Sequence, residues 1–141
     1  MAAAEYIMAL DVGEKRIGVA LAHVVARLPR ALTTLQRSDH VYSDIAALVQ
    51  EERVAAVVVG LPRGMDGGYT EQTRRSEAFK TELAEHLAVP IYLADETLSS
   101  IRAEAELGTK PHTKEEVDAL AACFILEEYL QSTGPVELKH E

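Results

Sequence analysis

One short segment restricts the possible fold more than any other part of the chain. Residues 54–59 read Val-Ala-Ala-Val-Val-Val, a continuous apolar run that Gly60 and Pro62 bring to an end. A strand with one face in water alternates apolar and polar residues, whereas a strand covered on both faces is apolar throughout. Doubly covered strands belong to parallel sheets with helices on either side. The segment therefore predicts an α/β protein.

The rest of the chain supplies the strands and helices for such a sheet. Apolar runs at 6–10 and 17–22 flank Gly13, which predicts an antiparallel hairpin whose tight turn uses a glycine with positive φ. A third strand is predicted at 27–34, on an edge because Pro29 has no amide proton, and a buried strand at 89–94. Helices are predicted from a cap at Ser38 or Asp39 to about Glu52, from residue 69 or 70 through Leu87, from residues 97–100 to Gly108, and from the capping box at 113–116 to about Tyr129.

Length and composition fit a single domain. The chain has 141 residues, and we expect residues 1–132 to form one domain and 133–141 a polar C-terminal tail. The single cysteine, Cys123, excludes an internal disulfide, and its apolar neighbours predict a buried small side chain rather than a nucleophile. With no basic leader and no apolar run near the roughly 20 residues that cross a bilayer, we expect a cytoplasmic protein without a membrane partner.

Three acidic positions are predicted to meet at one edge of the sheet. Asp11 ends the first strand, Asp95 and Glu96 follow the strand at 89–94, and Asp118 lies in the last helix. Ligands of such sheets bind beyond the carboxyl ends of the strands. Taken singly, each acid has a simple structural role, either in a turn or near the positive end of a helix. Grouped without cationic partners they would repel one another, whereas Mg²⁺ or Mn²⁺ would turn them into a metal site.

Charge gives weaker guidance about partners. The net charge of −9 argues against a protein that coats nucleic acid through a broadly basic surface. A nuclease remains compatible with this charge, because metal ions held by acidic residues provide positive charge locally. Lys15, Arg16 and Arg63 flank the predicted strand ends, and contact with phosphate or simple exposure to solvent would explain them equally well.

Four segments then match a known family in the right order. They are Leu10–Ala20, Val59–Pro62 with Met65–Gly67, Asp95–Glu96, and Val117–Ala122. Together, over nearly the full length, they resemble the YqgF-like family of Holliday-junction-resolvase-like or pre-16S rRNA nucleases. The resemblance implies an RNase H-like fold, with a mixed five-stranded sheet in which an antiparallel meander of the first three strands adjoins two parallel strands, flanked by helices.

The resemblance also implies an activity and a site. It implies hydrolysis of phosphodiester bonds with two Mg²⁺ or Mn²⁺ ions, bound by the catalytic residues Asp11, Glu96 and Asp118, with Asp95 as the alternative to Glu96. The implied partner is a nucleic acid, either Holliday junction DNA or the 5′ end of pre-16S rRNA. The chain is expected to act as a monomer or a homodimer.

Two departures from the family pattern keep an alternative open. The family has a Ser-Asp pair where this chain has Ala22-His23, and it has an arginine where this chain has Thr97. The missing arginine favours a non-catalytic nucleic-acid- or RNA-polymerase-associated factor that keeps the fold. The motif Asp11-Val-Gly13 also resembles the phosphate motif of actin-like and sugar-kinase-type ATPases. Those enzymes close a cleft between two such domains, whereas 141 residues supply only one.

Overall fold

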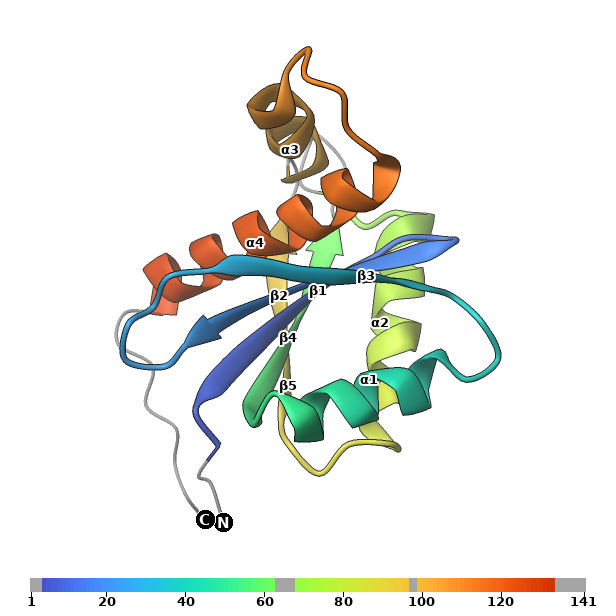
Figure 1. Ribbon diagram of the computed structural model, residues 1–141. Coiled ribbons are helices and arrows are strands. Elements are labelled where there is room, and N and C mark those ends of the chain that lie inside the picture. The colour runs from blue at the N-terminus through green and yellow to red at the C-terminus, as the bar shows by residue number, and fades with distance from the viewer. Residues whose placement is uncertain (1–3, 63–67, 97–98, 134–141) are drawn as a thin grey trace.

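The computed structural model describes residues 4–62, 68–96 and 99–133. These residues form one mixed five-stranded sheet with strand order β3-β2-β1-β4-β5, in which β1, β2 and β3 are antiparallel and β1, β4 and β5 are parallel (Figure 1). The predicted architecture is confirmed. In chain order the elements are β1 (Tyr6–Val12), β2 (Arg16–His23), β3 (Arg30–Gln36), α1 (Val41–Glu51), β4 (Val54–Pro62), α2 (Glu71–Ala84), β5 (Ile91–Glu96), α3 (Ser99–Leu107) and α4 (Lys114–Thr133).

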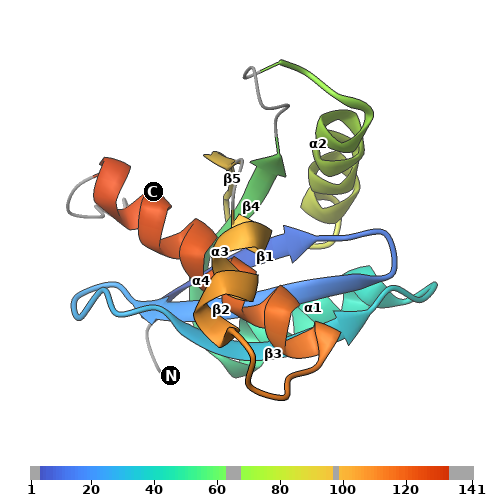
Figure 2. The same cartoon turned by 90° about the horizontal axis from the view of Figure 1, so that it is seen from above.

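Helices cover both faces of the sheet. Helices α1 and α2 pack on one face, α4 packs on the other, and α3 lies on α4 (Figures 1 and 2). Successive side chains of β1 point to opposite faces of the sheet, so the strand contributes to both cores. Met8 and Leu10 belong to the core under α1 and α2, while Ile7 and Ala9 belong to the core under α4. None of the described helices is long and apolar enough to cross a membrane.

Strand β4 is buried on both sides, as its sequence predicted. Val57 and Val59 pack with α1 and α2, while Val58 packs with α4, and all three are fully buried. At roughly 25 cal/mol per Å² of apolar surface removed from water, each such side chain stabilises the fold by about 1.5–3 kcal/mol. The central position of β4, between β1 and β5, follows from this double burial.

Small residues let α4 come close to the sheet. A Cβ atom built on Gly18 of β2 would lie 1.9 Å from the carbonyl oxygen of Asp118 in α4. A Cβ atom on Gly60 would lie 2.5 Å from Cδ1 of Ile125. The alanines Ala9, Ala20 and Ala22 complete the same small-residue face beneath the helix. Backbone therefore meets backbone at Gly18.

Several element boundaries differ from the sequence prediction. Strand β3 begins at Arg30 rather than at residue 27, because Arg27 adopts φ 57° in a turn and its N–H donates to the carbonyl of His23 at 2.8 Å. Asp95 and Glu96 lie inside β5 rather than after it, since β4 continues to Pro62 and its backbone groups find partners there. Helix α4 continues to Thr133 instead of ending near residue 129.

Two predicted turn and cap features were also wrong. Positive φ was expected at Gly13, but among the described glycines it occurs at Gly108, where it ends α3 as predicted. Gly13 is needed for another reason, because its N–H donates to the carbonyl of Arg16 at 2.9 Å and a Cβ would lie 2.8 Å from that oxygen. Helix α1 begins after His40, which caps it without a side-chain hydrogen bond, rather than after Ser38 or Asp39.

The substitution Gly18→Ala is expected to lower the free energy of unfolding by about 3 kcal/mol, the upper part of the range for overpacked cores. The added methyl group meets backbone atoms of Asp118, which can move only if α4 moves. Urea unfolding followed by circular dichroism measures the loss. Gly60→Ala is the matched control with a smaller expected loss, because the tip of the Ile125 side chain can rotate away. Equal losses for the two variants would contradict the close approach at Gly18.

Candidate nuclease site

The backbone positions of two of the three predicted acids both adjoin a single glycine. Asp11 in β1 is paired in register with Gly18 in β2, and Gly18 touches the backbone of Asp118 in α4. Asp11 follows Ile7 and Ala9 in the alternation of β1, and those two residues face α4. The fold therefore brings Asp11 and Asp118 to the same face of the sheet, at the carboxyl end of β1.

Asp118 has a cationic partner in the chain itself. The Nε–H of Arg16 donates to Oδ2 of Asp118 at 2.6 Å, and the two side chains are 24% and 22% exposed. The hydrogen bond to Asp118 raises the pKa of Arg16 above its ordinary value, and the negative charges of Asp118 and Glu115 raise it further. Arg16 thus remains a cation at any physiological pH. The site is partly charge-compensated without a metal ion, which sequence reasoning about grouped acids did not anticipate.

The backbone of the third acid, Glu96, lies at the same edge of the sheet. Glu96 is the last residue of β5 and pairs with Pro62, and β4 lies between β5 and the strand that carries Asp11. Two strand spacings separate β1 from β5, roughly 10 Å. The side chains of Asp95 and Glu96 lie outside the described part of the structure. Arg63 and Thr97 lie outside the described residues altogether.

The basic residues near this edge have different surroundings. Arg16 is committed to Asp118, so it is neither a solvated surface charge nor an open phosphate ligand in this state. Lys15 is exposed on the turn between β1 and β2. Arg37, which follows β3, also reaches this turn, and its Nη1–H donates to the carbonyl of Gly13 at 3.0 Å. Nothing in the sequence singled out Arg37, because its position depends on the pairing of β3 with β2, which sets Gln36 opposite Arg16.

The donor set at this edge suits a hard divalent cation. Asp11 and Asp118 provide carboxylate oxygens, which are the ligands that Mg²⁺ and Mn²⁺ prefer. Among the residues whose side chains are described, no three of His, Cys, Asp and Glu are close enough to hold a metal ion together. A complete set of three carboxylates at this edge would therefore have to include a residue from the end of β5.

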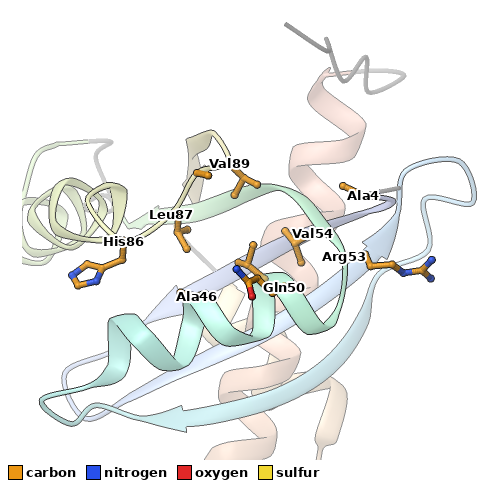
Figure 3. Close-up of a pocket in the computed structure, with 10 residues that line it drawn as sticks. Ala4, Ala46, Gln50, Arg53, Val54, His86, Leu87 and Val89 are labelled. Carbon is orange, nitrogen blue, oxygen red and sulfur yellow. The ribbon is translucent and has the colours of Figure 1, made fainter. Parts of the chain in front are cut away.

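An apolar cavity lies at the other end of the sheet. It has a volume of about 310 Å³ and lies between α1 and the segment that leads into β5 (Figure 3). Its lining includes Ala4, which precedes β1, and Val54, which begins β4. These are the amino ends of parallel strands, opposite the end where ligands of such sheets bind. The cavity is therefore separate from the acidic edge.

Cys123 lies on the α4 side of the core and is not a nucleophile. Its side chain packs in the same cluster as Ala122 and Leu126. Burial, with a smaller contribution from the charge of Glu127, raises the pKa of the thiol to about 11. The expectation of a buried small side chain is confirmed.

The thiol of Cys123 should therefore react slowly in the native protein. At pH 8 a pKa of about 11 leaves about 0.1% of the thiol as thiolate, against about a quarter for an ordinary cysteine. We expect modification by DTNB, followed by absorbance, to be at least about a hundredfold slower in buffer than in denaturing urea. Similar rates in the two solvents would show that Cys123 is accessible.

The fold and the acidic edge define a class, an RNase H-like α/β domain with carboxylates at the ends of its parallel strands. Comparison with known proteins then gives the family. Residues 5–132 match the family model described as "RuvX: Holliday junction resolvase". The chain belongs to this family.

Relatives with similar sequences cover almost the whole chain. A protein of Chloroflexus aggregans is 42% identical over 132 residues, which are 89% of this chain and 93% of that protein. A protein of Thermoanaerobacter pseudethanolicus is 37% identical over 133 residues, covering 89% and 96% of the two chains. Both carry the name "Putative pre-16S rRNA nuclease".

Solved structures support the fold. RuvC of Thermus thermophilus matches with a TM-score of 0.54 and 14% identity, over 92% of this chain and 97% of that one. The same protein in complex with a Holliday junction substrate gives a TM-score of 0.53 and 17% identity, over 93% and 97% of the chains. At such low identity the similarity concerns the fold alone.

Proposed function

We propose that this protein is a divalent-metal-dependent endonuclease that hydrolyses phosphodiester bonds in structured nucleic acid, either Holliday junction DNA or the 5′ end of pre-16S rRNA. The single observation that carries the proposal is the placement of Asp11 and Asp118 against each other across Gly18. Membership of the RuvX family and the names of the relatives support the same activity.

The proposed site consists of Asp11, Asp118 and Glu96, with Asp95 as the alternative to Glu96. These carboxylates would be the ligands of two Mg²⁺ or Mn²⁺ ions. Bound metal would supply a water of lowered pKa and would offset the charge that develops on the phosphate. The backbone of Asp11 is fixed by its strand and that of Asp118 by the contact of α4 with Gly18, so metal binding would require only the side chain of Asp118 to turn away from Arg16.

Arg16 has two roles in this proposal. In the absence of a cation it neutralises Asp118 and so removes the repulsion between Asp118 and Asp11. When the carboxylate of Asp118 turns to another cation, the guanidinium of Arg16 is released beside the substrate. Its planar fork of N–H donors matches the oxygens of a phosphate.

The substitution Asp11→Asn is expected to reduce metal-dependent cleavage at least about a hundredfold while the fold is kept, because a neutral amide replaces a charged carboxylate ligand of the proposed metal site. The assay follows cleavage of Holliday junction DNA and of a pre-16S rRNA 5′ segment side by side, with Mg²⁺ or Mn²⁺. Asp44→Asn is the control, since Asp44 is on the exposed side of α1 and pairs with His40.

The results of this assay separate the candidate functions. Equal cleavage by the parent and by the Asp11→Asn variant would show that the site is elsewhere. If the parent protein cleaves neither substrate with either metal but binds one of them, the non-catalytic factor is favoured instead. Cleavage of one substrate alone would decide between DNA and RNA.

A second prediction concerns the affinity for metal rather than the rate. Arg16→Gln is expected to bind Mn²⁺ on the order of fivefold more tightly, because the ion no longer competes with the guanidinium for Asp118. Isothermal titration calorimetry measures the affinity, and Arg53→Gln is the control, since Arg53 pairs with Glu5. Weaker binding by Arg16→Gln would instead mean that Arg16 holds Asp118 in position.

The proposed substrates also indicate where the protein acts. A pre-16S rRNA or a Holliday junction is found where the genome is transcribed and copied, so we expect the protein in the bacterial cytoplasm. We expect a monomer or a homodimer, which sedimentation of the purified chain would distinguish.

A further inference from the structure

A polar groove lies at the same end of the sheet, on the face opposite α4. It has a volume of about 210 Å³ and opens into a wider hollow of about 480 Å³. Figure 1 shows the turn between β1 and β2 beside α2, where the groove lies. We call it the Arg37–Arg75 groove, and its lining is Val12, Gly13, Glu14, Arg37, Gln72 and Arg75.

Arg37 is held in this groove as a pre-positioned cation. Its backbone N–H donates to the carbonyl of Lys15 at 2.9 Å, and its Nη1–H donates to the carbonyl of Gly13 at 3.0 Å. Its guanidinium carbon lies 5.2 Å from the centre of the Phe79 ring. Within the described part of the chain Arg37 forms no ion pair. A ligand that binds it therefore displaces no carboxylate and loses little side-chain entropy.

Arg75 faces the same space but has a weak partner. Its Nη1 pairs with a carboxylate oxygen of Glu14, and these side chains are 50% and 73% exposed. Ion pairs this exposed contribute little free energy, so an incoming anion can take the place of Glu14. Asp39 lines the wider hollow and adds a second negative charge. The groove itself thus holds two arginines and one acid, and the wider hollow adds a second acid. The affinity of the groove for anions depends on whether an anion can replace Glu14 at Arg75.

The groove and the proposed nuclease site lie on opposite faces of the same end of the sheet, beside the turn between β1 and β2. The first lining residue of the groove is Val12, which follows Asp11 in β1 and points to the opposite face of the sheet. Exposed Lys15 lies on the turn between the groove and the acids. A polyanion that crosses this turn would meet Arg75, Arg37 and Lys15 before it reaches Asp11.

We propose that the Arg37–Arg75 groove binds the phosphodiester backbone of a nucleic-acid strand, next to the segment that lies at Asp11 and Asp118. The inference rests on the proposed function, because the strand held in the groove is the one whose bond the acids would cut. Two arginine forks spaced along a groove recognise phosphate oxygens, not bases, so the binding is expected to be independent of sequence.

The test measures binding without cleavage. Fluorescence anisotropy of labelled single-stranded RNA, single-stranded DNA and branched DNA is followed with the full chain in EDTA, over a range of salt concentrations. Arg37→Gln and Arg75→Gln are each expected to weaken binding about two- to fivefold and to lower the salt dependence by about one phosphate contact. Glu14→Gln is expected to tighten binding by a similar factor, because Arg75 is then released.

Controls come from a similar arginine at the other end of the sheet. Arg53 pairs with Glu5 at 3.3 Å and lies over the ring of Tyr6, so it resembles both Arg75 and Arg37 in its contacts. Arg53→Gln and Glu5→Gln are expected to leave binding unchanged. If Arg37→Gln and Arg75→Gln bind as tightly as Arg53→Gln, or if Arg53→Gln weakens binding equally, the groove is not the binding site.

This test is independent of the nuclease proposal. Loss of cleavage in Asp11→Asn with unchanged binding in EDTA supports the site at Asp11 and says nothing against the groove. Unchanged binding in Arg37→Gln and Arg75→Gln, in a protein that still cuts, overturns the groove alone. If RNA binding depends on the two arginines and DNA binding does not, the groove selects RNA.

Discussion

The contact between α4 and β2 at Gly18 is the constraint on which the rest of the structure depends. A glycine there lets the carbonyl of Asp118 approach the sheet more closely than any side chain would allow. The same glycine is the register partner of Asp11. One close packing contact therefore holds α4 against β2 and brings the backbone of Asp118 to the strand position opposite Asp11. Stability and the proposed chemistry depend on the same few atoms, because an acid pair is useful only if its separation is fixed.

Electrostatic compensation within the chain explains how an acidic protein could handle an anionic substrate. Arg16 pairs with Asp118 at the acidic edge, and Arg75 pairs with Glu14 in the Arg37–Arg75 groove. In both places an arginine that could contact phosphate pairs with a carboxylate of the chain itself. Metal and nucleic acid would then bind by exchanging ion pairs, and such exchange is sensitive to salt. The net charge of −9 does not report this local arrangement.

The two ends of the sheet differ in chemical character, which follows from strand direction. The carboxyl ends of β1, β4 and β5 share one edge, where Asp11 lies one residue before the end of β1 and Glu96 ends β5, and the amino ends border an apolar cavity. Backbone N–H and C=O groups beyond the carboxyl ends of the strands form no hydrogen bonds within the sheet, so polar side chains and ligands are found there.

The sequence by itself determined the layers of the fold and predicted which acids lie at one edge of the sheet. The valine run at 54–59 required a doubly covered strand, and the order of periodic segments required a mixed sheet, because alternation and helical spacing are local properties. Asp11 and Asp118 were predicted as site residues, and in the fold the backbone positions of both adjoin Gly18. Only the tertiary structure showed that Arg16 pairs with Asp118, that Gly18 serves close packing, and that Arg37 belongs to this end of the sheet. These facts depend on contacts between residues up to about a hundred positions apart, and no local pattern in the chain encodes such distances.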